Sequence, residues 1–126
     1  NVWRDDGRAF SLDPIALAEA RWLLEGDRHL TLSPLERWFA YLPFEHAEDR
    51  ALQRLSVDCF DALHESVAIK PDERSPIDAI AGALGYAERH REGIERFGRF
   101  PHRNRMLGRE STEAERAYLA QPGSGF

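Results

Sequence analysis

The sequence predicts an all-α fold, and three observations support this prediction. Helix start signals recur along the chain: Asp13 stands before a proline, Ser33 stands three residues before Glu36, and Thr112 stands three residues before Glu115. Apolar residues follow these signals at three- and four-residue steps, which is the period of a helix with one buried face. The sequence holds no convincing alternating strand, two-residue hairpin signal or glycine-rich phosphate loop.

The first two predicted helices follow an irregular lead-in over residues 1–12. Asp13 caps free N–H groups, and the proline after it needs no N–H at the first helical position. Gly26 ends this helix. Its apolar face contains Ile15, Leu17, Ala18, Trp22 and Leu23. Ser33 opens a second, short helix that runs to about Tyr41, and Pro43 then interrupts it.

A third helix is expected to begin at Phe44 or Glu45 and to continue to about Glu65. Its buried stripe advances by helical steps through Ala51, Leu52, Leu55, Cys59, Ala62 and Leu63. Residues 68–75 come next and contain a proline, an aspartate and further charged residues. This composition predicts a surface loop.

The last two predicted helices are one long and one short. Ser75 before a proline opens the long helix, and Gly98 closes it. Its buried arc is expected to contain Ile77, Ile80, Leu84, Ala87, Ile94 and Phe97. Residues 101–107 suit a short helical turn, and a capping box at Thr112 starts a final helix that ends near Leu119, before a tail over residues 121–126.

Length and composition indicate one domain over residues 1–126, because 42% hydrophobic residues suffice for a single core. The formal net charge of -5 repels polyanions and argues against a nucleic-acid partner. No apolar run approaches the roughly 20 residues of a membrane-spanning helix, and no signal peptide pattern is present. Cys59 is the one cysteine and cannot form an internal disulfide, so we expect a cytoplasmic protein.

Two carboxylates extend the buried stripe of the expected third helix. At about 100° per residue, Glu45 and Glu48 fall on the face that carries its apolar residues, whereas His46 points elsewhere. A buried carboxylate requires a paired or hydrogen-bonding partner. Acids in a first helical turn also offset the helix dipole and join structural ion pairs, and we favour this structural interpretation over a functional site.

Basic partners for these acids are expected from residues 90–109, which are rich in arginine, histidine and phenylalanine. Guanidinium groups match the planar geometry of a carboxylate or phosphate, so the same segment suits an anionic ligand. The candidate ligand-binding residues are Arg96, Arg99, Arg103, Asn104 and His90.

Histidines in this segment differ in what their positions predict. His90 projects into the apolar arc of the long helix, which is typical of a hydrogen-bonded core residue. His102 follows a proline at a helix boundary and is better placed to face a cleft, so His102, Glu45 and Glu48 are the candidates for an acid–base role. Their spacing matches no established zinc motif, and we predict no metal and no cofactor.

Three strings and the closing G-S-G-F resemble the bacterial domain-of-unknown-function family number 924 over nearly the whole chain. The strings are Y-L-P-F-E-H-A-E-D at 41–49, R-F-G-R-F-P-H-R-N at 96–104 and L-G-R-E-S-T at 107–112. The resemblance implies an all-helical protein with antiparallel helix pairs in a tetratricopeptide-repeat-like, right-handed superhelical arrangement. It also implies that a helical segment, which precedes the position of Asn1 in family members, is missing from this chain. The family has no agreed activity.

Two functions are compatible with these observations. The first is a scaffold that binds a protein or peptide, because the predicted helices pair and no recognisable catalytic motif is present. The alternative is an enzyme or small-ligand binder, in which Glu45 and Glu48 face His102, Arg99 and Arg103 across a polar pocket for an anionic ligand. Neither function involves nucleic acid or a membrane, and the oligomeric state is left open.

Overall fold

Helices account for all the regular secondary structure of the computed structural model, which describes residues 7–69 and 76–125. The α-helices are α1 (Asp13–Leu24), α2 (Pro34–Glu45), α3 (Arg50–Ile69), α4 (Ile77–Phe97) and α5 (Glu113–Leu119). Short 3-10 segments span Gly7–Phe10, Glu25–Thr31 and Pro101–Arg103. The all-α prediction is therefore confirmed for the described residues. Half of the predicted lead-in over residues 1–12 and most of the loop over 68–75 lie outside them.

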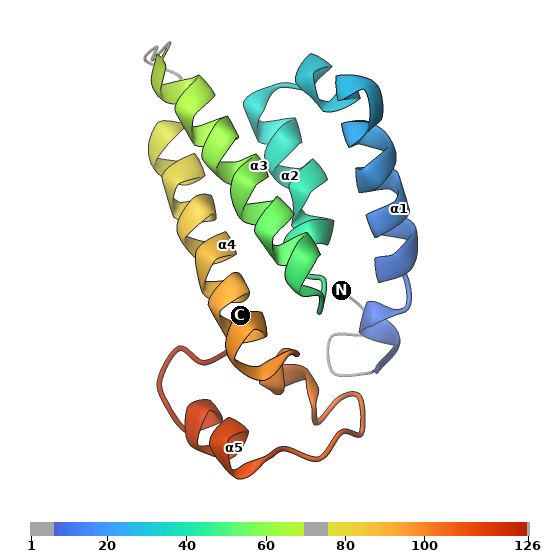
Figure 1. Cartoon of the computed structure of the whole chain (residues 1–126), viewed down its shortest axis with the longest axis vertical. Helices are drawn as coiled ribbons and strands as arrows, with labels where there is room; N and C mark the ends of the chain where they lie inside the picture. Colours follow the sequence, from blue (N-terminus) through green and yellow to red (C-terminus); the bar gives the residue numbers. More distant parts are fainter. Residues whose placement is uncertain (1–6, 70–75, 126) are drawn as a thin grey trace.

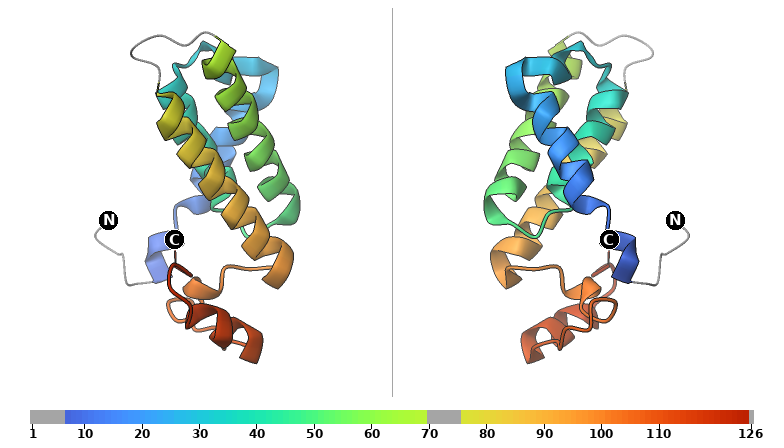
Figure 2. Two further views of the ribbon diagram at one scale, coloured as in Figure 1. Left: turned by 90° about the vertical axis from the view of Figure 1, so that its left-hand side faces the viewer. Right: turned by 90° about the vertical axis from the view of Figure 1, so that its right-hand side faces the viewer.

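The four longer helices run alternately up and down, with α3 between α2 and α4 and with α1 beside α2 (Figure 1). The segment that follows α4, including α5, lies at the end of the helices where α4 finishes. Figure 2 shows that the 3-10 turn Gly7–Phe10 lies at this same end. Residues from both ends of the described chain therefore meet near the last turns of α2 and α4.

The predicted capping boxes are present, but the predicted cap at Asp13 is wrong: Asp13 is the first residue of α1, and no side chain caps this helix. Ser75, the predicted start of the long helix, lies outside the described residues. Ser33 accepts a hydrogen bond from the Glu36 N–H, and the Glu36 carboxylate accepts one from the Ser33 N–H, so both halves of a capping box form. Thr112 and Glu115 repeat this arrangement at α5. Gly98 ends α4 in a left-handed conformation with φ of 74°, which a glycine adopts without steric cost.

The predicted break at Pro43 is wrong. Pro43 lies inside α2, which continues to Glu45, and α3 begins only at Arg50. A proline removes one backbone hydrogen bond, yet the helix is held by the burial of Phe44, which is fully enclosed. The connection over residues 46–49 ends at Asp49, whose Oδ1 accepts from the Leu52 N–H at 2.9 Å and so starts α3.

The hydrophobic core lies between α2, α3 and α4 around Phe44, Phe60, Leu63 and Ile80. The stripe predicted for α3 is only partly correct. Leu63 is buried, but the buried face of α3 otherwise comprises Gln53, Ser56, Val57, Phe60 and Val67. The prediction missed this face because it contains two polar residues. The arc predicted for α4 holds better, since Ile80, Ala87 and Ile94 are all buried.

The apolar face predicted for α1 is largely uncovered. Ala20 is buried, but Ile15 is 62% exposed and Trp22 is 52% exposed. Only α2 and the Glu25–Thr31 segment pack extensively on α1. The helix therefore contributes one edge of the molecule rather than part of its core. Within the described chain, no helix has both the length and the apolar character required to cross a membrane.

Candidate functional site

A cavity of about 600 Å³ opens at the end of the molecule where the Gly7–Phe10 turn, α2, α4 and the Pro101–Arg103 turn meet. Part of its lining is apolar and mostly aromatic, with Phe10, Trp38, Phe39, Leu42 and Tyr86. The rest of the lining carries ionisable side chains: Asp13, Glu45, His46, His90, His102 and Arg103. A molecule in this cavity would contact both aromatic rings and charged groups.

Glu45 ends α2 and is one of the most enclosed groups in the cavity wall, with 3% of its surface exposed. The Gln53 side chain sets its position. The Gln53 Nε2 donates to the Glu45 carbonyl at 2.6 Å and to the Ala47 carbonyl at 2.8 Å. These carbonyls lie at a helix end, where backbone acceptors lack helical partners. A core amide of α3 therefore fixes the end of α2 that carries the carboxyl group.

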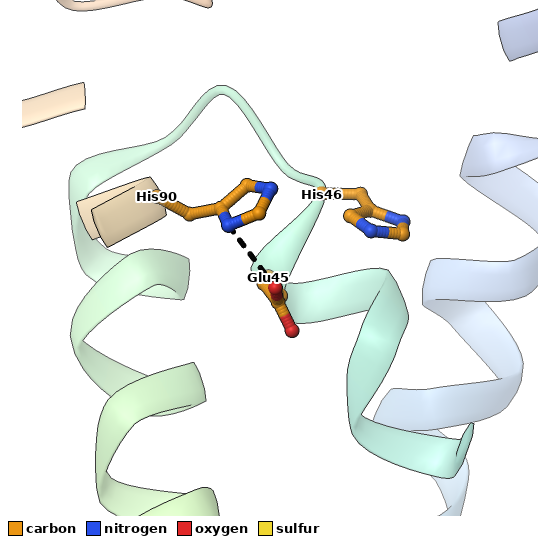
Figure 3. Close-up of side chains that lie close together, drawn as sticks. All are labelled: Glu45, His46 and His90. Atoms are coloured by element: carbon orange, nitrogen blue, oxygen red, sulfur yellow. Dashed lines mark ion pairs between the residues drawn. The ribbon is translucent and has the colours of Figure 1, made fainter. Parts of the chain in front are cut away.

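His90 of α4 contacts Glu45, with 3.0 Å between His90 Nδ1 and Glu45 Oε1 (Figure 3). The same Nδ1 lies 2.7 Å from the Tyr86 carbonyl oxygen. Because that carbonyl can only accept, Nδ1 carries the proton. Burial raises the pKa of Glu45 to about 7 and lowers the pKa of His90 to about 4. The contact is therefore a hydrogen bond from a neutral imidazole, and not an ion pair at neutral pH.

Two further histidines line the cavity. His46 caps the end of α2, and the centre of its ring lies 5.8 Å from that of His90. Burial of the ring and the nearby Arg103 guanidinium lower the pKa of His46, although part of the side chain reaches solvent. Burial, followed by Arg103, also lowers the pKa of His102. The neutral forms of all three histidines are thus favoured.

Arg103 brings the positive charge of the cavity and is 8% exposed. Its Nη2 donates to the His46 carbonyl at 2.9 Å, while its Nη1 lies 3.7 Å from Glu48 and 3.9 Å from Asp13. Its guanidinium also covers the ring of Phe10 at 4.3 Å. These contacts fix the position of the Arg103 guanidinium group beside the cavity.

The prediction that Glu45 and Glu48 share one face of a helix is wrong, because Glu45 ends α2 and Glu48 lies in the connection to α3. The expected meeting of acids with residues 90–109 does occur. Glu48 accepts from the Arg109 Nη1 at 2.9 Å and from the Phe100 N–H at 3.0 Å. Glu48 therefore anchors the chain after α4 and does not line the main cavity.

Three of the predicted ligand-binding residues lie outside the cavity. Arg99 forms a two-pronged contact with Glu115, at 2.7 and 3.0 Å. Asn104 donates to the same carboxylate at 3.0 Å and is almost fully buried. Arg96 covers the rings of its neighbour Phe97 and of Tyr118. These contacts support the fold of the segment that carries His102 and Arg103.

Several groups of this site are not among the predicted residues. The sequence predicts that His46 points away from Glu45, because both are expected on a helix that begins at Phe44 or Glu45. No local signal places His46 at the cavity, because its position depends on the end of α2 at Glu45. Asp13 was interpreted only as a cap, yet it lines the cavity. Gln53 carried no sequence signal for its role, because a glutamine at helical spacing is ordinarily a surface residue.

The described residues define an all-helical protein with an open pocket that is lined by aromatic, acidic, histidine and arginine side chains. The chain belongs to a bacterial family of proteins of unknown function, because the family model "Bacterial protein of unknown function (DUF924)" matches residues 1–123 of this sequence. The resemblance found in the sequence strings is thereby confirmed.

A solved structure also resembles this chain. A protein of unknown function from Agrobacterium tumefaciens, ATU0120, is 37% identical, with a TM-score of 0.75. The match covers 93% of this chain and 57% of that chain, so the present chain spans little more than half of that protein's length. No curated protein matches this chain.

Proposed function

We propose that the cavity binds a small molecule that has an anionic group and an apolar body. The convergence of Glu45, His90, His102 and Arg103 in the lining of an open cavity of about 600 Å³ carries this proposal. Sealed ion pairs would leave no room for a ligand, but these groups face a space of the size that small-molecule sites occupy. Arg103 receives the anionic group and the aromatic part of the lining receives the apolar body.

Acid–base chemistry is the enzymatic form of this proposal. Glu45 and His102 line the same cavity as Arg103, so a ligand anchored by Arg103 brings its remaining atoms near both groups. A group with a pKa near the working pH both accepts and donates protons efficiently. Burial raises the pKa of Glu45 to about 7, which suits this role.

Binding is tested by calorimetry with phenyl phosphate and benzoate as anionic probes and benzyl alcohol as the neutral probe. We expect saturable binding of an anionic probe only. A hydrogen bond to a charged group contributes about 1.5–3 kcal/mol, so Arg103→Met should weaken binding by about 10- to 100-fold. Arg105→Met is the matched control, because Arg105 is a nearby exposed arginine outside the cavity. Equal effects of the two substitutions, or no saturable binding of either anion, would contradict the proposal.

A second candidate function is the binding of an amphipathic helix from a partner protein. Exposed apolar side chains support this function. Phe39 and Tyr86 line the cavity and are 63% and 54% exposed, and Ile15 on neighbouring α1 is 62% exposed. Exposed apolar patches of this kind are typical of interaction sites. The tetratricopeptide-repeat-like superhelical arrangement belongs to this proposal, and the alternating directions of α1 to α4 support it (Figure 1). Both proposals treat residues 1–126 as one helical domain of a cytoplasmic protein.

The second function is tested with a fluorescent amphipathic peptide that presents leucines at positions i, i+3, i+4 and i+7. Fluorescence anisotropy should show saturable binding that Phe39→Glu abolishes. Ile69→Glu is the control, because Ile69 is 76% exposed at the far end of α3. If both substitutions reduced the affinity for the peptide equally, the binding would be nonspecific and this second function would be contradicted.

A further inference from the structure

Three metal-ligating side chains meet in the wall of the cavity. Glu45, His46 and His90 each offer one ligand atom, and these atoms lie within 4.8 Å of one another. Glu45 and His46 come from the end of α2, and His90 approaches them from α4 (Figure 3). The sequence spacing did not reveal this group, because its members come from two helices that only the fold brings together.

One of the three ligands, His90, makes a contact of the kind found around metal sites, and the backbone of the other two is held by Gln53. A metal-binding histidine usually donates its second ring N–H to a backbone carbonyl or a carboxylate. The Nδ1 of His90 makes this contact with the Tyr86 carbonyl at 2.7 Å. Gln53 fixes the backbone on both sides of His46, through the carbonyls of Glu45 and Ala47. The ligands are therefore anchored from outside the space that they enclose.

The charges around this group are compatible with a cation. Arg103 is the positive side chain nearest to it in the cavity wall, and two carboxylates face Arg103: Glu48 at 3.7 Å and Asp13 at 3.9 Å. Their carboxylates place negative charge close to the guanidinium. A dication at Glu45 would therefore not meet an isolated positive charge.

We propose that Glu45, His46 and His90 bind a zinc-class divalent metal ion. Two imidazoles and one carboxylate are a ligand set that zinc uses in catalytic sites, where three protein ligands leave one position open. A tetrahedral zinc ion holds its ligand atoms about 3.3 Å apart, which follows from metal–ligand distances of about 2.0–2.1 Å. The ligand atoms here lie within 4.8 Å of one another, so they would draw closer around a metal ion. Because His90 Nδ1 carries the proton, its Nε2 would be the ligand, and the Glu45 carboxylate would turn from Nδ1 towards the metal.

All three ligands line the cavity that Arg103 also lines, so a fourth ligand of the metal would come from this cavity. A bound metal ion would polarise an oxygen of a molecule held there or activate a water molecule. The inference is independent of the proposed binding of organic anions, because metal binding is measured with no such molecule present.

The test uses the chain after treatment with EDTA and removal of the chelator. Zn²⁺ is titrated by calorimetry, and Co²⁺ by visible absorption, which reports the coordination of the metal. We expect one equivalent of either metal to bind and Co²⁺ to show the intense absorption of a four-coordinate site. His46→Ala should weaken Zn²⁺ binding at least about tenfold, since it removes a ligand from a set of three.

His64→Ala is the matched control, because His64 lies on α3 outside the cavity and should leave Zn²⁺ affinity unchanged. Glu45→Gln provides a second ligand variant of nearly the same shape. Circular dichroism shows whether each variant retains its helices. Absence of stoichiometric binding, or an equal affinity of the His46→Ala and His64→Ala variants, would overturn the metal site. If phenyl phosphate still bound in the presence of EDTA, the proposed anion binding would remain supported although the metal site was refuted.

Discussion

At the residue scale, the site depends on polar side chains that the fold buries with their partners. Gln53 is fully buried, and it satisfies carbonyls at the end of α2 that would otherwise lack donors. Glu115 is the corresponding residue after α4. Its carboxylate receives hydrogen bonds from Arg99, Asn104 and the Thr112 backbone, and only 2% of its surface is exposed. Both residues stabilise the local backbone that carries the cavity groups.

The pH dependence of stability follows from Glu115. The Arg99 guanidinium, together with Asn104 and Thr112, holds the pKa of Glu115 at about 2, below its ordinary value of 4.5. A depressed carboxyl pKa stabilises the folded state above the unfolded pKa, and this contribution is lost as pH falls from about 4.5 towards 2. We therefore expect Glu115→Gln to lower the free energy of unfolding by about 2 kcal/mol at pH 7.

The same substitution should have a much smaller effect near pH 2, where the carboxyl group is protonated in the unfolded state and about half protonated in the folded state. Urea denaturation at both pH values measures this difference. Glu113→Gln is the control, because Glu113 is exposed in the same helical turn. A destabilisation by Glu115→Gln that is equal at the two pH values would show that the carboxylate charge is not responsible.

At the element scale, the connection between α2 and α3 determines which groups reach the cavity. α2 passes through Pro43 and ends at Glu45, so Glu45 and His46 are placed one after the other where the chain leaves the helix. The connection then ends at Asp49, whose carboxylate caps α3. Four residues therefore separate the two helices and carry Glu48 towards Arg109.

The substitution Asp49→Ala measures how much this N-cap contributes to the stability of the protein. Loss of a helix N-cap costs about 1 kcal/mol, so we expect the free energy of unfolding to fall by about that amount. Asp58→Ala on the exposed face of α3 should change it by less than about 0.5 kcal/mol. Chemical denaturation of both variants provides the comparison. An Asp49 variant as stable as the Asp58 variant would mean that the helix start does not depend on this side chain.

At the scale of the whole molecule, the segment after α4 folds back against the end of the helices (Figure 2). Glu48 is the main polar link, because it accepts from Arg109 and from the Phe100 backbone and lies 3.7 Å from Arg103. This link joins residues more than fifty positions apart in the chain. It keeps His102 and Arg103 at the cavity formed by α2 and α4.

Glu48→Gln should loosen this segment without melting the helices. The charged contacts of Glu48 contribute about 1.5–3 kcal/mol, so local opening over residues 99–119 should become about tenfold or more frequent. Hydrogen–deuterium exchange should show faster exchange there and unchanged exchange in the buried parts of α3 and α4. Glu95→Gln is the control, since Glu95 forms only exposed pairs with Arg50 and Arg54. Uniform acceleration along the chain would indicate general destabilisation instead.

The sequence alone determined the all-helical class, the capping boxes at Ser33 and Thr112, and the family to which the chain belongs. These features depend on residues close together in the chain, where spacing and local hydrogen bonds suffice. It also predicted that Glu48 would meet the basic segment after α4, because a buried acid requires a partner.

Only the tertiary structure decided which candidates share the cavity. His46 and Asp13 line it, whereas Arg99 and Asn104 pair with Glu115 and support the segment behind it. α2 continues through Pro43 to Glu45, about one turn beyond its predicted end at Tyr41, so Glu45 and Glu48 do not share a helix. The direction of a side chain depends on where a helix ends, and that is set by burial of residues such as Phe44 against distant parts of the chain, which no local pattern records.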